Sequence, residues 1–221
     1  CATALCCAYL LWRLRANGAT KSAKYEIYNC PMSACAMLAL SWGSAALLPS
    51  YDSTLTLSFF IVAMNYGTRL GWVGAKGMLC NLADTVFSLQ PARAAAWHGR
   101  LAVVGDFFWP LFVFGMTLGL LQSASSHATR DSALAHRGIA VAFATLATMC
   151  AITSAMYAVG AVGTSRAERA LGHSTGTKLL RSKLRQQRTL AWTGAFTTGG
   201  WSVFLAALAT YRGARLVCGL V

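Results

Sequence analysis

The sequence predicts an all-α, polytopic membrane protein with about five transmembrane helices and one interfacial amphipathic helix. Hydrophobic residues make up 56% of the 221 residues and charged residues only 11%, whereas soluble domains carry about 25% charged residues. Five apolar runs are each close to or above the ~20 residues that a helix needs to cross a bilayer. A strongly basic stretch at 164–188 separates the last two runs, as loops on the positive side of a membrane do.

The first 29 residues comprise a short apolar segment and a basic surface segment. Residues 1–12 are apolar but too few to cross ~30 Å of hydrocarbon, and four basic residues follow them. We therefore expect a surface helix, a helix covered by a partner, or the end of a longer segment. Cys1 in place of an initiator Met indicates a processed or incomplete chain.

The transmembrane bundle is expected over residues 30–211, followed by a C-terminal tail at 212–221. The first two runs are separated by Pro-Ser-Tyr-Asp at 49–52, which is typical of a tight turn. The five predicted spans are 30–48, 53–72, 101–122, 138–163 and 189–211.

The stretch 70–90 fits both a sixth span and an interfacial helix. It contains Lys76 and Asp84, and each charge costs about 2.5–3.5 kcal/mol at a membrane centre. Its polar residues recur on one helical face and its large apolar residues on the other, which is the pattern of an amphipathic helix at an interface. We therefore predict an interfacial helix over 76–90.

The distribution of charge favours five spans and orients them. With five spans, 15 of the 19 basic residues lie on the side of the N-terminus, and four lie on the other side. A sixth span at 70–90 would place the loop 164–188 opposite the basic N-terminal segment, against the positive-inside rule. The N-terminus is therefore expected on the matrix, stroma or cytosol side and the C-terminus opposite. The net charge of +13 then reflects topology, and we expect no nucleic-acid partner.

Small residues predict how the helices pack, because helices in lipid associate through close approach of their backbones. Gly115 and Gly119 lie one turn apart in the third span. We expect small-residue faces to pack within the bundle or, alternatively, on a partner subunit. The fourth span has alanines at helical spacing, at Ala140, Ala144, Ala147, Ala151 and Ala155.

One acid lies well inside a predicted span. Asp106 is followed four residues later by Pro110, which cannot donate a hydrogen bond to its carbonyl, so that the helix is loosened there. An acid inside a membrane is a candidate proton or ion site. The structural alternative is a carboxyl bonded to a neighbouring helix or to Arg100. Asn65 in the second span is a candidate partner, or a purely structural hydrogen-bonding residue.

Residues 98–105, His-Gly-Arg-Leu-Ala-Val-Val-Gly, are similar to a helix-start signature of the light-harvesting antenna family, Glu-x-x-His/Asn-x-Arg-x-Ala-Met-x-Gly. In that family the Glu and Arg form an ion pair between helices and help to bind chlorophyll. The resemblance therefore implies His98 as a candidate pigment ligand. The chain departs from the signature at Ala95 and Val103, where the family has Glu and Met, and a second copy does not occur in the sequence.

Signatures of other chemistry are absent from the sequence. It contains no Cys-x-x-Cys pair, zinc-type cluster, catalytic triad, phosphate-binding loop or dinucleotide fingerprint. The four histidines fall at the edges of spans or in loops, so a haem between two helices is not expected. We predict no metal site and no enzyme activity.

The basic stretch 164–188 has helical spacing, so the fifth span is expected to continue beyond the membrane as a helix. It either sets topology by contact with anionic head groups, or binds an acidic partner subunit or a lipid such as cardiolipin. The candidate residues of this basic arm are Lys178, Arg181, Lys183, Arg185 and Arg188.

These observations predict a non-catalytic accessory subunit of a larger membrane complex, with bound anionic lipids. Polar groups are scarce in the spans, and the loops are too short to form a domain outside the membrane. The Ala- and Arg-rich composition and the missing initiator Met suggest respiratory or photosynthetic electron transport, in the mitochondrial inner membrane or the thylakoid. The alternatives are a transporter or channel built around Asp106 and a pigment-binding, antenna-like subunit that holds chlorophyll.

Overall fold

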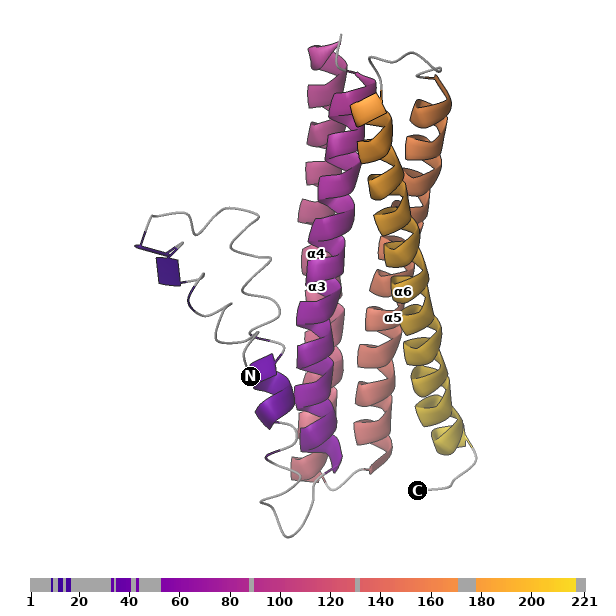
Figure 1. Cartoon of the computed structure of the whole chain (residues 1–221). Helices are drawn as coiled ribbons and strands as arrows, with labels where there is room; N and C mark the ends of the chain where they lie inside the picture. Colours follow the sequence, from indigo (N-terminus) through magenta and orange to yellow (C-terminus); the bar gives the residue numbers. More distant parts are fainter. Residues whose placement is uncertain are drawn as a thin grey trace.

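The part of the chain that the computed structural model describes contains four long helices in an antiparallel bundle (Figure 1). They are α3 (Ser53–Val86), α4 (Pro91–Thr129), α5 (Ser132–Ala170) and α6 (Lys178–Val217). The described residues are 53–87, 90–129, 132–170 and 178–217, with 9, 12, 13, 15, 16, 33, 35–40 and 43 nearer the N-terminus. Among these residues only Phe87 and Gln90 lie outside helices and none lies in a strand, so the predicted all-α class is confirmed.

Two of the helices are long and apolar enough to cross a membrane, namely α4 over Pro91–Ser125 and α5 over Ala133–Ala170. The predicted count of about five spans is therefore not confirmed. Of the predicted span 30–48 the structure describes only residues 33, 35–40 and 43, and of the apolar segment 1–12 only residues 9 and 12, so both lie largely outside the described residues. The helices have 34 to 40 residues, and at ~1.5 Å per residue they are about 51–60 Å long.

The fold differs from the prediction in the first half of the bundle. The predicted span 53–72 and the predicted interfacial helix 76–90 form one continuous helix, α3, which ends at Val86. The sequence favours a break because of the two charges in this stretch. The bundle accommodates both of them beside α4, where Asp84 pairs with a histidine and Lys76 lies over a glycine.

The glycines of α3 do not interrupt the helix either. A glycine costs an α-helix about 1 kcal/mol relative to alanine, and at Gly71 and Gly74 close packing against neighbouring helices offsets that cost. A Cβ placed on Gly71 would lie 3.5 Å from Thr153 of α5 and 3.6 Å from Thr198 of α6. A Cβ on Gly74 would meet the hydroxyl of Tyr157.

α4 and α5 cross where one glycine faces another. A Cβ placed on Gly119 would lie 2.5 Å from the carbonyl oxygen of Gly138, and one placed on Gly138 would lie 2.5 Å from the amide nitrogen of Ser123. Real Cβ atoms do not approach so closely, so the two backbones are in direct contact. One turn away on α4, Gly115 faces Thr145. The predicted Gly115 and Gly119 face therefore packs inside the bundle.

α5 and α6 form the most extensive helix pair, and two serines join them between the helix ends. The hydroxyl of Ser154 donates a 2.7 Å hydrogen bond to the carbonyl oxygen of Ala195, and the hydroxyl of Ser202 donates one of 2.9 Å to the carbonyl oxygen of Ala147. Near the far end, Nη1 of Arg212 lies 3.1 Å from Nδ1 of His136. These contacts fix the antiparallel register of the pair.

α5 is the centre of the bundle because each of the other three helices has its most extensive contact with α5. Its predicted alanine series is divided between two faces. Ala147 is buried and Ala140 half-buried, but Ala144, Ala151 and Ala155 are exposed. The buried core around α5 comprises Ile61, Met116, Ile139, Ala142, Phe143, Leu146, Ala147, Cys150 and Leu205.

Candidate functional site

Charge is distributed unevenly along the bundle. The C-terminal ends of α3 and α5 and the N-terminal ends of α4 and α6 lie together, at the top of Figure 1, and we call this the basic end. The opposite end carries Arg137, Arg212 and Arg215 among the described charged residues of the four helices. Described basic residues near the basic end are Arg93, Arg100, Arg166, Arg169, Lys178, Arg181, Lys183, Arg185 and Arg188.

An apolar belt lies between the two ends. The contacts between neighbouring helices show which residues of different helices lie at the same height along the bundle. In this belt α5 and α6 have no charged residue, whereas α3 and α4 have four, namely Arg69, Lys76, Arg100 and Asp106. The belt comprises about residues 58–82 of α3, 98–120 of α4, 139–162 of α5 and 189–211 of α6.

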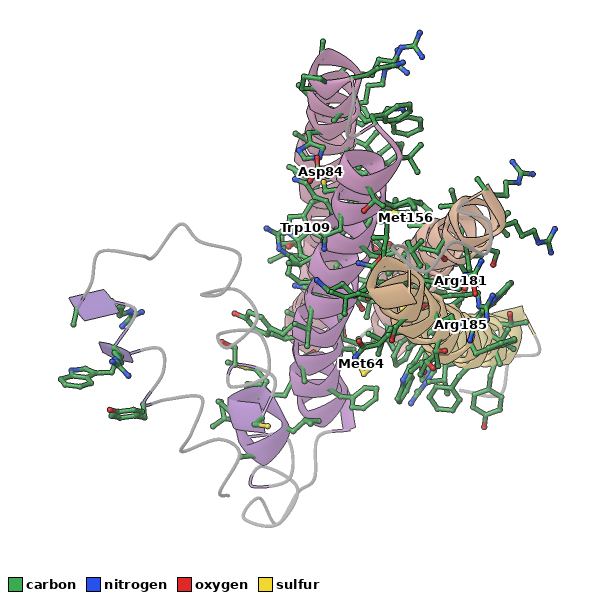
Figure 2. The ribbon with its side chains drawn as sticks, turned by 45° about the horizontal axis from the view of Figure 1, so that its top comes forward. Met64, Asp84, Trp109, Met156, Arg181 and Arg185 are labelled. Carbon is green, nitrogen blue, oxygen red and sulfur yellow. The ribbon has the colours of Figure 1, made fainter. Side chains whose placement is uncertain are left out.

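Three of these charged residues, Arg69 and Lys76 of α3 and Asp106 of α4, lie within about two helical turns of one another near the middle of the belt. We call these three residues the charged layer. The guanidinium of Arg69 lies 4.5 Å from the centre of the Trp109 ring, a cation–π contact. A Cβ placed on Gly105 would lie 3.8 Å from Nζ of Lys76. Asp106 follows Gly105 directly and precedes Trp109 by three residues, so its backbone lies between the levels of the two cations. Trp109 lies on the α3–α4 side of the bundle in Figure 2.

The predicted partner of Asp106, Asn65, lies at a different level. Since Lys76 and Trp72 lie over Gly105, Asp106 is opposite about residue 73 of α3. Asn65 is then about eight residues away along α3, which is ~12 Å at 1.5 Å per residue. The structure therefore does not bring the predicted pair together. The signal that sequence reasoning missed is the spacing of seven between Arg69 and Lys76, which places both on one helical face.

His98, the candidate pigment ligand, has partners on α3. Its Nε2 lies 3.0 Å from Oδ1 of Asp84 and 3.4 Å from the backbone oxygen of Cys80. A pigment metal at Nε2 would therefore have to displace Asp84. The arrangement joins the C-terminal end of α3 to the N-terminal end of α4, so it has a structural role in the hairpin.

One acidic residue of α5, Glu168, binds two residues of the basic arm. Its carboxylate accepts a 2.7 Å hydrogen bond from Nε of Arg185 and a 2.8 Å hydrogen bond from Nη1 of Arg188. The hydrogen bond from Arg185 is the main cause that holds the pKa of Glu168 below its ordinary value of 4.5. Burial opposes this effect, and the charges of Arg188 and Arg181 add to it. Arg181 and Arg185 lie side by side along α6 in Figure 2.

The residues of the predicted basic arm thus differ in what they contact. Arg185 and Arg188 join α5 to α6, and Arg181 is half-buried beside them. Lys183 is exposed, and Lys178 begins α6. The exposed cations near the basic end are Arg93 and Arg100 on α4, Arg166 and Arg169 on α5, and Lys183 and Arg185 on α6.

α4 turns a row of large apolar side chains outward. Only 18% of the most apolar stretch of α4 is buried inside the structure, compared with 44% for α5. The exposed residues recur at spacings of three and four, so they share one helical face. They are Val104, Phe107, Leu111, Phe114, Leu118 and Leu121.

No metal centre is formed by the described residues, which contain no group of three or more His, Cys, Asp or Glu side chains that could hold an ion. Their cysteines, Cys35, Cys80 and Cys150, are free thiols. Comparisons of the chain with protein-family models, with curated proteins and with solved structures found no match.

Proposed function

We propose that the chain is an integral membrane protein and a non-catalytic accessory subunit of a larger membrane complex. The apolar face of α4 supports the membrane location, because soluble monomers rarely expose apolar patches larger than a few hundred Å². In a bilayer the same face contacts lipid tails without cost. The length of the helices, about 51–60 Å, exceeds the ~30 Å of hydrocarbon, so the basic end projects into the head-group region.

The observation that carries the subunit role is a small-residue face on α5. Ala144, Thr148, Ala151 and Ala155 recur at spacings of four, three and four and are all exposed. Thr148 donates its hydroxyl hydrogen bond to the carbonyl of Ala144, in its own helix, so the face is smooth and its polar group is satisfied. Helices in lipid associate through such faces, since small side chains allow close backbone contact. The face therefore suits a helix of a partner subunit.

We propose that the basic end binds anionic lipid head groups such as those of cardiolipin. Each Lys or Arg near an anionic surface contributes about 1 kcal/mol of attraction, and Arg166, Arg169 and Lys183 are exposed there. By the positive-inside rule this end faces the matrix, stroma or cytosol. An organellar membrane, the mitochondrial inner membrane or the thylakoid, is supported by the Ala- and Arg-rich composition alone.

Purification of the tagged chain from its native membrane in mild detergent tests the subunit role. We expect it to co-purify with other subunits in fixed stoichiometry. Ala151→Phe, which enlarges the small-residue face, is expected to release the chain from that complex. Leu111→Phe at the same level of α4 is the matched control, because Leu111 is 53% exposed on the lipid-facing side. A solitary, monodisperse protein, or equal recovery of complex with both variants, would contradict the proposal.

A second function is favoured by the charged layer, which places Arg69, Lys76 and Asp106 within the apolar belt. Ionisable residues inside a membrane often line a path for protons or ions. The second proposal is therefore a transporter or channel that uses the α3–α4 interface. Asp106→Asn tests it in liposomes: proton or ion flux should fall while assembly is retained, and unchanged flux would refute this function.

A further inference from the structure

A pocket of about 610 Å³ lies between α3 and α6 in the apolar belt, with α5 as its floor and Leu38, nearer the N-terminus, also in its lining. Its volume lies in the ~300–1,000 Å³ range of small-molecule sites. Of the helix pairs that pack together, α3 and α6 have the least contact with each other, which leaves room for the pocket. Met64 lies between these two helices in Figure 2.

The two ends of the pocket differ in polarity. Towards the basic end it is lined by the hydroxyl side chains of Tyr157, Thr193 and Thr197. At the other end the lining is apolar and includes Phe60 and Trp201. Charged residues are missing from the lining contributed by the described residues, so an ionised ligand would lose its hydration without gaining a counter-ion.

Tyr157 supplies a hydrogen-bond donor that the bundle does not use. The hydroxyl of Thr193 donates to the carbonyl of Thr189, and that of Thr198 to the carbonyl of Gly194. Within the described part of the chain, no hydrogen bond is formed by the hydroxyl of the exposed Thr197 or by that of the half-buried Tyr157. Its ring packs on Gly194, where a Cβ would lie 2.8 Å from Cδ1 of the tyrosine, so the ring is held in position at the polar end.

Gly67 of α3 borders the pocket directly. It lines the pocket, and a Cβ placed on it would have nothing within 4 Å. A larger side chain at this position would therefore occupy the pocket without a clash with the surrounding helices. Gly77, ten residues further along α3, also has nothing within 4 Å of its Cβ position but does not line the pocket.

We propose that this pocket binds an uncharged amphiphile that has a carbonyl head and an alkyl tail. The carbonyl oxygen accepts a hydrogen bond from the Tyr157 hydroxyl. The tail lies along Phe60 and Met64, away from the basic end. In the proposed membrane location, the space between α3 and α6, which Leu38 also borders, is reached from the surrounding hydrocarbon. This binding site is independent of whether the chain acts as an accessory subunit or as a channel.

Equilibrium binding of radiolabelled decyl-benzoquinone to the purified full chain in uncharged lipid nanodiscs tests the proposal. We expect saturable binding to the wild type, a loss of at least about tenfold in affinity for Gly67→Leu, and unchanged affinity for the control Gly77→Leu. Tyr157→Phe should weaken binding about fivefold, the usual worth of one neutral hydrogen bond. Decylbenzene, which lacks the carbonyls, should bind the wild type and Tyr157→Phe equally.

Several results would overturn the proposal. They are the absence of saturable binding to the wild type, equal effects of Gly67→Leu and Gly77→Leu, and tighter binding of the charged analogue decanoate than of the quinone. Helical content by circular dichroism and elution volume establish that each variant is folded. Since Gly67 and Gly77 are equally open positions on one helix, a difference between their variants reports on the pocket.

Discussion

Glu168 of α5 accepts a 2.7 Å hydrogen bond from Nε of Arg185 on α6. The two residues are 17 positions apart in the sequence and meet because α5 and α6 form an antiparallel hairpin. The contact directs Arg185, a residue of the basic stretch 164–188, towards α5 of the same chain. It also gives the basic end a pH dependence that can be measured.

We expect the bundle to lose stability at low pH through Glu168. The pKa of this carboxyl is lowered in the folded chain by Arg185 and Arg188, so the folded state favours the charged form. The stabilisation is complete above the ordinary pKa of 4.5 and is lost as the pH falls through the lowered pKa. Melting temperatures of the wild type and Glu168→Gln should differ near pH 7 and converge in acid. Lys183→Gln, at an exposed charge of the same helix, should melt like the wild type at every pH.

The contact between Gly119 and Gly138 predicts a strong effect of one added methyl group. Gly119→Ala would force the two backbones apart, because its Cβ would lie 2.5 Å from the carbonyl oxygen of Gly138. Overpacking of this kind costs about 1–3 kcal/mol. Unfolding in detergent should show that loss, whereas Gly99→Ala on the same helix, with nothing within 4 Å of its Cβ position, should be neutral or slightly stabilising. Equal stabilities of the two variants would exclude a close crossing at Gly119.

The cation–π contact in the charged layer predicts energetic coupling between Arg69 and Trp109. A double-mutant cycle with Arg69→Met and Trp109→Leu should give a coupling free energy of about 0.5–2 kcal/mol. Each single variant is expected to weaken the α3–α4 hairpin. Strictly additive losses would show that the two side chains act separately.

The sequence predicts the helical class and most helix positions well, because long apolar runs and helix spacing are local signals. The glycines of the third predicted span also lie at a helix crossing, as small residues in such a pattern do. The sequence does not predict the continuity of α3, because the full cost of Lys76 and Asp84 applies only where such charges face lipid. Both residues lie beside α4 in the structure, and this placement depends on tertiary packing, which local spacing does not encode.

The candidate site was only partly predictable for the same reason. Asp106 and the basic arm stand out as charges in an apolar context, and both lie at positions where helices meet. The contact of the arm with Glu168, and the level of the Asp106 backbone beside Arg69 and Lys76, follow from the antiparallel register. That register is set by contacts between residues far apart in the sequence, and it places the backbones of Asp106 and Asn65 about two helical turns apart along the bundle.

The proposed subunit role depends most on the exposed small-residue face of α5, and site-specific photocrosslinking tests this face directly. A photoreactive amino acid at Ala151 in the native membrane should give a discrete adduct with a second protein chain. The same group at Leu111, on the apolar face of α4, should give no protein adduct. Recovery of the chain without any protein adduct from Ala151 would contradict the proposal that it is a subunit of a larger complex.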